Sequence, residues 1–518
     1  MNVLHKTLVF YVKRSILISS CRNHKIWNKY SDTVETTSLF PHVRDARDVL
    51  MDPHLFHEKI QQYLMTQAKH SIVVEGDKNW SSENSDQMRN ILENDGEIDF
   101  FSLLPGTMNR YVVQYRNVES ANTILYQGKN GAIENQMVSI KTGTEPTSKK
   151  QTSSSIIGSL SKSKTNTLYQ LLDQQETMDD QMKIFTERNV MSSAEIRVRY
   201  IFLNVLKKFF AKHTGIVHVR PYGSSLSGAG RPGTDFDVVL LTKDFIKYIS
   251  KPLPNSIQYM DTEGATRREL FKESVEVLEE IKHVLQHLPG AKNVKFISQA
   301  RIPIVKFHFS LVNLSVDISA NQLNSNSMLN VLNWYMRYDS RVLQVMIIIR
   351  KWAEDRNLLS HGMNFHGFTP FMLQMLILMY LMKIDIIPPM HKIGSVRRDE
   401  FKLFSTPAKF VQMNNSDSVE QIICGFFEHF ARYGLMGYKM QPKYGLIRAR
   451  PSSNKQLWIT NPFDNSHNIV KNCNIESMNT FIEHMQKTCQ IIEFRRHKLS
   501  DRDWGLNAIL NTKDTTNS

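Results

Sequence analysis

Cysteine is scarce in this chain, and its few positions exclude two common ways of stabilising a fold. The 518 residues include four cysteines, at Cys21, Cys424, Cys473 and Cys489. No two of them form the CxxC spacing of zinc sites, and they are too few and too scattered for a disulfide framework. The sequence therefore predicts neither structural zinc nor disulfides, which suits a reducing compartment.

Long hydrophobic runs are missing as well. The apolar run Phe371–Met382 is far shorter than the roughly 20 residues that a membrane-spanning helix needs. It predicts a buried helix, in which Met372, Met375 and Met379 pack in a core. We expect no membrane partner, and the chain contains no internal repeats.

Acidic residues are absent from the first 31 positions, where basic ones are frequent. Lys13 and Arg14 also interrupt the apolar stretch that a secretory signal would need. A basic, serine-containing and acid-free N-terminus is typical of mitochondrial targeting sequences. Residues 1–40 are therefore predicted to be a transit peptide that directs the protein to the mitochondrial matrix. The cations of this segment are Lys6, Lys13, Arg14, Arg22, Lys25 and Lys29.

The remaining chain is still basic. Removing the six cations of residues 1–31 from the net charge of +14 leaves +8. A basic excess favours polyanions, because lysine and arginine release counterions from phosphates. The hydrophobic content of 41% suffices for packed cores, and the length predicts several domains.

Two aspartates carry the strongest chemical signal. The segment from Tyr222 to Leu241 reads YGSSLSGAGRPGTDFDVVLL, in which Asp235 and Asp237 stand two apart on an apolar run. Side chains two apart on a strand project to the same face, so the two carboxylates repel each other unless a cation lies between them. Hard oxygen ligands suit Mg²⁺, or Mn²⁺ in its place. The preceding glycine-rich stretch has bare backbone N–H groups that could hold phosphates.

This pattern resembles the signature of the DNA polymerase β-like nucleotidyltransferases, in which Gly-Ser is followed by Gly and then by Ser/Thr-Asp-x-Asp. Gly223, Ser224, Gly228, Thr234 and the two aspartates lie in register with it. The resemblance implies that Asp235 and Asp237 are catalytic metal ligands, and that Gly223 and Ser224 bind the nucleotide.

A third carboxylate is expected on a neighbouring strand. Val305–Leu311 and Leu314–Ile318 read as a hairpin that turns at Asn313, and Asp317 lies near its end. Asp-Ile-Ser-Ala-Asn resembles the third motif of noncanonical poly(A) polymerases and terminal uridylyltransferases. The resemblance makes Asp317 a metal ligand or general base for the attacking RNA 3′-hydroxyl, and Asn321 a nucleotide-binding residue.

Further matches follow in the family's order over residues 195–490. Arg350 and Lys351 precede Trp-Ala, as in the family helix whose cation reaches the triphosphate. Glu354 departs from the pattern, because a second basic residue often stands there. Thr369 and Phe371 resemble the motif that contacts triphosphate and base. His467, in NPFDNSHN, resembles the uridylyltransferase residue that hydrogen-bonds uracil; a histidine that merely forms the pocket wall is the alternative.

The resemblance implies an α+β protein. A helical poly(A)-polymerase-associated domain over 326–490 follows N-terminal helices and a palm over 168–325. Residues 41–135 resemble a degenerate RNA-recognition motif without its aromatic platform, used for homodimerisation or for positioning RNA; a plain α/β module is the alternative. Residues 141–167 are predicted to be a linker and residues 491–518 a basic polar tail.

The mitochondrial poly(A) polymerases are the members that the chain resembles most. The resemblance implies template-independent addition of AMP from ATP to RNA 3′ ends with two Mg²⁺ ions and no DNA template. Two alternatives stay open: a terminal uridylyltransferase or promiscuous nucleotide adder, and a catalytically silent RNA-binding relative. The presence of all three carboxylates argues against the silent relative.

Overall fold

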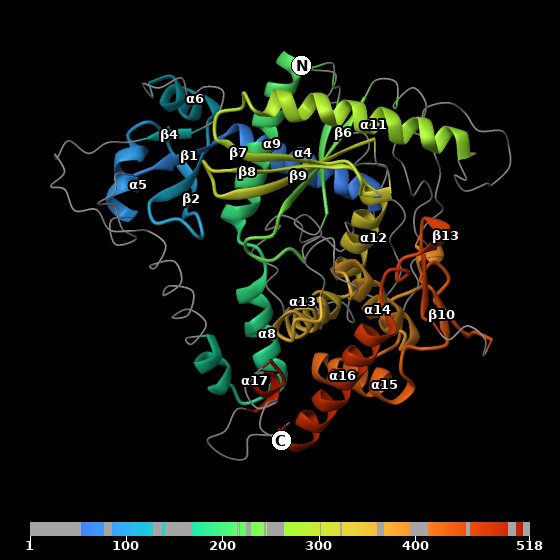
Figure 1. The fold of residues 1–518 in the computed structure, drawn as a ribbon. Coiled ribbons are helices and arrows are strands. Elements are labelled where there is room, and N and C mark those ends of the chain that lie inside the picture. Colours follow the sequence, from blue (N-terminus) through green and yellow to red (C-terminus); the bar gives the residue numbers. More distant parts are fainter. Residues whose placement is uncertain are drawn as a thin grey trace, which may run out of the picture. The chain divides into compact units, whose positions relative to one another are not determined.

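The computed structural model describes most of the chain after residue 52. The predicted transit peptide 1–40, the predicted linker 141–167 and Ser224 lie outside the described residues. All described residues fall in one compact unit, Asp45–Ser518. It contains many helices, and its described strands form three sheets in which most neighbouring strands are antiparallel, which confirms the predicted α+β class (Figure 1). The described residues are 53–76, 85–127, 137–139, 168–214, 216, 218–223, 229–242, 245, 264–300, 302–321, 324–359, 367–393, 413–451, 456–495 and 504–510.

The first part is a small α/β module. Its strands form one sheet in the order β2-β3-β1-β4, in which β4 runs parallel to β1. One face of the sheet packs on α5 and α6, where Ile72, Val113 and Tyr115 meet Met88 and Leu92. The elements are α4 (Pro53–Lys69), β1 (Ser71–Glu75), α5 (Ser85–Glu93), β2 (Ile98–Leu103), β3 (Arg110–Tyr115), α6 (Val118–Gln127) and β4 (Met137–Ser139).

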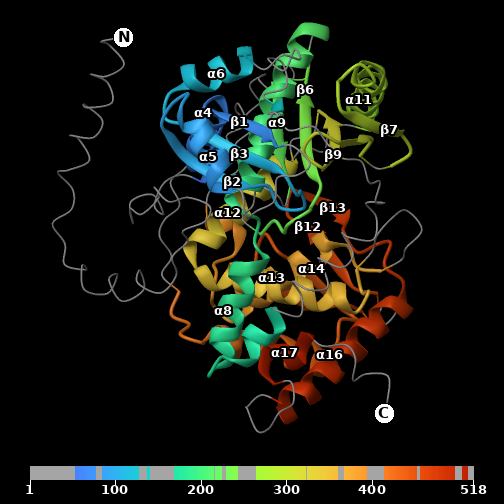
Figure 2. The ribbon, with the colours of Figure 1, turned by 90° about the vertical axis from the view of Figure 1, so that its left-hand side faces the viewer.

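The opposite face of this sheet lies against helix α9 (Ser193–His213) of the next domain (Figure 2). Arg197 of α9 stacks its guanidinium 3.9 Å from the ring centroid of Phe100, and its Nε donates to Oε1 of Gln114 over 3.0 Å. Val73 and Val112 on this face are fully buried. An RNA-recognition motif stacks bases on its sheet. Here the corresponding face is covered by the chain itself.

The palm is a five-stranded sheet in the order β5-β6-β9-β8-β7. Strands β6 and β9 are parallel, and the other neighbours are antiparallel. The predicted hairpin is confirmed as β8 and β9, and Asn313 in its turn has the left-handed φ of 53°. The palm elements are α8 (Met178–Asn189), α9, β5 (His218–Tyr222), β6 (Phe236–Leu241), α11 (Gly264–Leu285), β7 (Ala291–Ile297), β8 (Ile304–Phe309) and β9 (Leu314–Ala320).

The C-terminal part is mostly helical, as predicted. Its core includes the fully buried Trp352 and the predicted Met372, Met375 and Met379. The sequence did not predict its small sheet, ordered β11-β10-β12-β13. The elements are α12 (Asn324–Tyr338), α13 (Ser340–Asp355), α14 (Pro370–Lys383), a 3₁₀ turn (Met390–Lys392), α15 (Val419–Tyr433), β10 (Tyr438–Gln441), β11 (Leu446–Ala449), β12 (Trp458–Asn461), β13 (Asp464–Asn468), α16 (Ile475–Arg495) and α17 (Gly505–Leu510).

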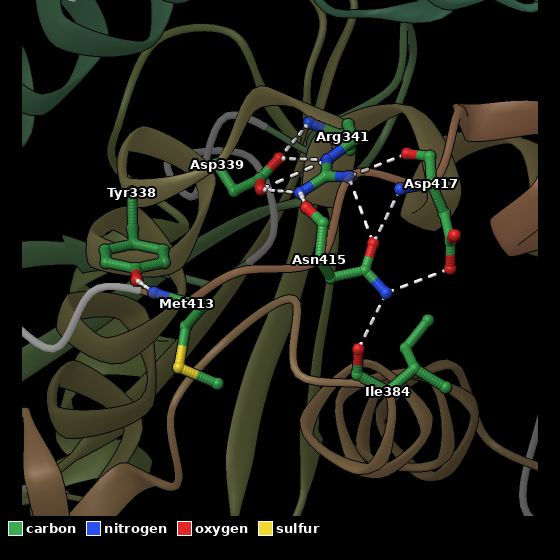
Figure 3. A network of polar contacts seen from close by, with 7 residues as sticks. All are labelled: Tyr338, Asp339, Arg341, Ile384, Met413, Asn415 and Asp417. Carbon is green, nitrogen blue, oxygen red and sulfur yellow. Dashed lines mark hydrogen bonds and ion pairs between the residues drawn. The ribbon is translucent and has the colours of Figure 1, made fainter. Parts of the chain in front are cut away.

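A network around Arg341 fixes the start of α13 (Figure 3). Asp339 caps the helix by accepting from the Arg341 N–H over 2.9 Å, and its carboxylate also holds the Arg341 guanidinium over 2.6 Å. The same guanidinium donates to the backbone oxygens of Asn415 and Asp417. Helix α13, which carries Arg350 and Lys351, is therefore anchored to the segment that precedes α15.

The prediction of a basic polar tail over residues 491–518 is wrong for residues 505–510. Residues Gly505–Leu510 form helix α17, whose six residues are all buried. The N–H of Leu506 donates to Oε1 of Gln181 on α8 over 2.7 Å, and the carbonyl of Ile509 accepts from Arg356. The surrounding polar residues conceal this short apolar run in the sequence. None of the described helices has the length and apolarity to cross a membrane.

Candidate active site

Strand register brings the predicted carboxylates together. Asp237 on β6 lies directly beside Asp317 on the parallel strand β9. Asp235 stands just before β6, two residues from Asp237. Adjacent parallel strands are about 4.8 Å apart, so paired side chains on one face are near neighbours. Two motifs that are 80 positions apart in the sequence thus form one acidic cluster.

The cluster is under electrostatic strain. Burial, together with the negative charges of Asp317 and Asp235, raises the pKa of Asp237 to about 7. Burial likewise raises the pKa of Asp317, with Asp235 adding to the shift. Charged oxygens removed from water and placed beside like charges favour protonation. The site is therefore short of positive charge.

Lys306 on β8 supplies one cation. It pairs across the sheet with Asp317, and its Nζ lies 2.7 Å from Oδ2 of Asp235 and 3.3 Å from Oδ1 of Asp317. The hydrogen bond from Lys306 to Asp235 raises the pKa of the lysine, although burial alone would lower it. Among the described residues, no three His, Cys, Asp or Glu side chains close into a metal cage. The ammonium lies between two of the three carboxylates instead.

Both the backbone conformation and the surrounding space require glycine at position 223. Its φ of +84° is in the left-handed region, and a Cβ there would lie 2.0 Å from Oδ2 of Asp237. The backbone after β5 therefore passes directly against the Asp237 carboxylate. This close approach agrees with the predicted role of Gly223 in the nucleotide loop. Its neighbour Ser224 lies outside the described residues.

Helix α9 holds the loop before Asp235, a role that the sequence did not reveal. Its first turn is fixed by a capping box between Ser192 and Glu195. Arg199 donates from Nη2 to the carbonyl of Thr234 over 2.6 Å, and Glu195 accepts from the Gly233 N–H over 3.3 Å. Arg199 is almost fully buried. The loop is thus clamped one residue before Asp235.

The charge of Glu354 is neutralised in the structure. Its carboxylate pairs with Arg350 on the same helix over 2.9 Å and with Arg231 from the loop before Asp235. Lys351 forms its own ion pair with Asp355. Burial and the nearby positive charge of Arg231 lower the pKa of Arg350 to about 10. Two guanidinium groups therefore share one carboxylate.

The palm domain matches a known protein-family model. Residues 178–337, which contain all three aspartates and Lys306, match the model "Poly(A) RNA polymerase, mitochondrial-like, central palm domain". This chain has a palm of the mitochondrial poly(A) RNA polymerase-like type. The predicted resemblance to noncanonical poly(A) polymerases of the DNA polymerase β-like superfamily is confirmed.

Comparisons that extend beyond the palm find relatives of the same kind. The mouse mitochondrial poly(A) RNA polymerase is 25% identical over 360 residues, which cover 66% of this chain and 61% of the relative. The Drosophila melanogaster enzyme is 24% identical over 316 residues, covering 58% and 51%. The chain thus spans between half and two thirds of the relatives' length. The crystal structure of mtPAP in complex with UTP has a TM-score of 0.68 at 21% identity, covering 88% of this chain and 99% of the other.

The other predicted site residues have contacts of their own. Thr369 is the N-cap of α14 and accepts from the Met372 N–H over 3.2 Å, and Phe371 packs half-buried against the helical core. Asn321, at the end of β9, accepts from Thr242 and donates to Glu273. Their nucleotide contacts stay predictions.

His467 lines a pocket of about 300 Å³ beside the small sheet. The aspartates of the palm do not line it. Its Nδ1 lies 3.5 Å from Nδ2 of Asn461. Trp458 in this pocket has Arg450 and Lys439 over its ring, at 5.3 and 5.6 Å from the centroid. The histidine is thus in a basic, aromatic setting that suits an anionic ligand with a flat ring. The remaining lining residues are Gln456, Ser466, Asn468 and Lys471.

The Gly223 contact predicts a selective effect on activity. Gly223→Ala should abolish nucleotide addition, because the new methyl group would displace the Asp237 carboxylate. Gly233→Ala is the matched control, since Gly233 has a similar φ of +76° but nothing within 4 Å of an added Cβ. Both variants bear the same backbone strain, of order 1 kcal/mol. Melting curves should show at least as much stability loss in Gly223→Ala as in Gly233→Ala, because the clash adds to the shared strain. Primer extension should show activity lost in Gly223→Ala and retained in Gly233→Ala, and similar activities in the two variants would disprove the contact's importance.

Proposed function

We propose that the protein is a template-independent RNA 3′-end adenylyltransferase. The observation that carries the proposal is the convergence of Asp235, Asp237 and Asp317 against Gly223, on a palm of the mitochondrial poly(A) RNA polymerase-like type. Carboxylates on a rigid sheet beside a glycine loop are suited to phosphoryl transfer, which depends on positioning and on charge stabilisation. The same convergence argues against a catalytically silent relative.

The three carboxylates fit a divalent cation. They offer only oxygen ligands, as Mg²⁺ and Mn²⁺ prefer. Burial and neighbouring negative charge raise the pKa values of Asp237 and Asp317, and a bound cation would offset that charge. When bound, such ions would lower the pKa of the attacking hydroxyl and neutralise the triphosphate. Asp235 and Asp237 would hold them, and Asp317 would be a further ligand of the ion that it shares with Asp235. Asp317, whose raised pKa suits a proton acceptor, would orient the RNA 3′-hydroxyl and take its proton.

The proposed substrates are ATP and RNA 3′ ends. Gly223 and Ser224 would hold the triphosphate from the palm side, and Arg350, with Lys351 beside it, from α13. Phe371 would stack on the base, a contact worth about 1–3 kcal/mol that tolerates every base. Homodimerisation through residues 41–135 is part of the proposal and can be checked by sedimentation velocity of the full chain.

The carboxylate cluster predicts activity loss without unfolding. Asp237→Asn should reduce AMP addition by more than a thousandfold, because it removes an ion ligand. Its melting temperature at pH 7.5 without metal should equal or exceed that of wild type, because the substitution relieves repulsion among three neighbouring like charges. Asp235→Asn and Asp317→Asn should be equally inactive. Primer extension with Mg²⁺ and thermal melts give both quantities.

Asp235 and Asp317 differ from Asp237 in one testable respect. Both contact Lys306, so their replacement also removes an ion-pair partner and should stabilise the protein less. Asp339→Asn, which breaks the structural pair with Arg341, is the control for a lost carboxylate outside the cluster. Activity within tenfold of wild type in any of the three cluster variants would rule out the proposed chemistry.

Base choice is the second question for the site. Crystal structures of mtPAP contain ATPγS, UTP, GTP or CTP, so that protein accommodates all four bases. We predict that this chain prefers ATP but also uses UTP, because neutral His467 can donate or accept a hydrogen bond and discriminates weakly. His467→Leu should raise the ATP/UTP ratio of kcat/KM. Better use of UTP than ATP by wild type would favour the uridylyltransferase alternative.

Localisation in the mitochondrial matrix is proposed from the basic N-terminus and from the mitochondrial names of the relatives. A fluorescent reporter fused to residues 1–45 should accumulate in mitochondria and resist external protease after outer-membrane rupture. Replacing Lys13 and Arg14 by glutamate is the control and should leave the reporter in the cytosol. A wild-type fusion that stays cytosolic would contradict this localisation.

A further inference from the structure

Lys306 is the one residue of the carboxylate cluster that the proposed chemistry does not use. Its ammonium lies 2.7 Å from Oδ2 of Asp235, and 3.3 and 3.5 Å from the two oxygens of Asp317. Its position is fixed by the sheet, because Lys306 and Asp317 are paired residues of the antiparallel strands β8 and β9. The lysine cannot leave this neighbourhood without breaking the palm; only its side chain can turn away.

The ammonium occupies the place that a shared ion would need. An ion held by both Asp235 and Asp317 must approach the same oxygens that now accept from Nζ. One carboxylate oxygen, Oδ1 of Asp317, is buried and accepts no hydrogen bond even with Lys306 beside it. The single charge of the lysine therefore leaves ligand capacity unused, and a divalent cation would satisfy it better.

We propose that Lys306 is a resident counter-ion that a divalent cation displaces from Asp235 and Asp317. The inference rests on the proposed function, since it concerns the ions that this function requires. In the metal-free protein, Lys306 holds two repelling carboxylates in their catalytic positions. When a divalent ion binds, it replaces the ammonium of Lys306 between the two carboxylates. The lysine therefore lowers the affinity of the site for the ion, but it keeps Asp235 and Asp317 in position when the ion is absent.

The surroundings of Lys306 support displacement over a permanent structural pair. The side chains of Lys306 and Asp235 are both 43% exposed, so the ammonium can move into water at little cost. The cations and carboxylates that face the cluster are Arg199, Asp235, Asp237 and Asp317. Arg199 is buried and clamped on the carbonyl of Thr234, so it cannot follow the carboxylates. The mobile cation of the cluster is Lys306.

The test is direct binding of Mn²⁺ to the full chain without nucleotide or RNA, measured by the loss of the free-ion EPR signal. Lys306→Met should bind Mn²⁺ about tenfold more tightly than wild type, because it removes a competing unit charge a few ångströms from the ligands. Without metal, the variant should melt at a lower temperature than wild type, and Mn²⁺ should raise its melting temperature by more. Lys306→Arg keeps the charge and should bind Mn²⁺ as weakly as wild type.

Lys295→Met is the matched control. Lys295 lies on the neighbouring strand β7, where it is paired with Lys306, and its side chain is exposed. Its replacement by methionine removes the same charge without touching the carboxylate cluster. It should leave Mn²⁺ affinity within twofold of wild type. Unchanged or weaker Mn²⁺ binding in Lys306→Met would overturn the proposal, as would equal tightening in Lys295→Met. Because no nucleotide is present, these outcomes are separate from the primer-extension assay, which alone decides the proposed adenylyltransferase activity.

Discussion

The structure depends on forcing three carboxylates together on one sheet. The parallel register of β6 and β9 sets Asp237 beside Asp317, and burial with like charges raises the pKa of Asp237 to about 7. Such an arrangement costs folding free energy, and the rest of the palm offsets the cost. Lys306 neutralises part of the charge, and the absence of a side chain at Gly223 leaves room for the Asp237 oxygen. Stability and activity therefore oppose each other at these positions.

Helix α9 links the two parts of the chain that precede the active site. On one side its residue Arg197 binds Phe100 and Gln114 of the N-terminal module. On the other, Arg199 and Glu195 hold the loop that ends at Asp235. The sheet face that would stack bases in an RNA-recognition motif is thereby used to buttress the helix that positions the catalytic loop. In this arrangement α9 covers the sheet face, and the face contributes structural support to α9.

Local sequence patterns predicted the structural features that depend on residues close together in the sequence. The hairpin β8–β9, the strands β1 and β3 and the pairing of Asp235 with Asp237 follow from alternation and turn residues. The contacts of Lys306 with Asp235 and of Arg199 with Thr234 could not be found this way, because these partners are 71 and 35 positions apart. Alternation gives the face of a side chain but not the neighbouring strand. Helix α17 was missed because six buried residues are too few for a periodic signal between polar segments.

Ion pairs explain how Glu354 is accommodated at a position where a basic residue was expected. A lone carboxylate four residues after Arg350 would repel a triphosphate, yet here it holds Arg350 and Arg231 together. Two guanidinium groups against one carboxylate leave one positive charge uncompensated, and Nε of Arg231 is buried without a hydrogen-bond partner. Because Arg231 belongs to the loop that leads to Asp235, Glu354 draws that loop toward α13. A cation on the loop, Arg231, thus stands where the resemblance expected a cation on the helix, and the local charge stays positive.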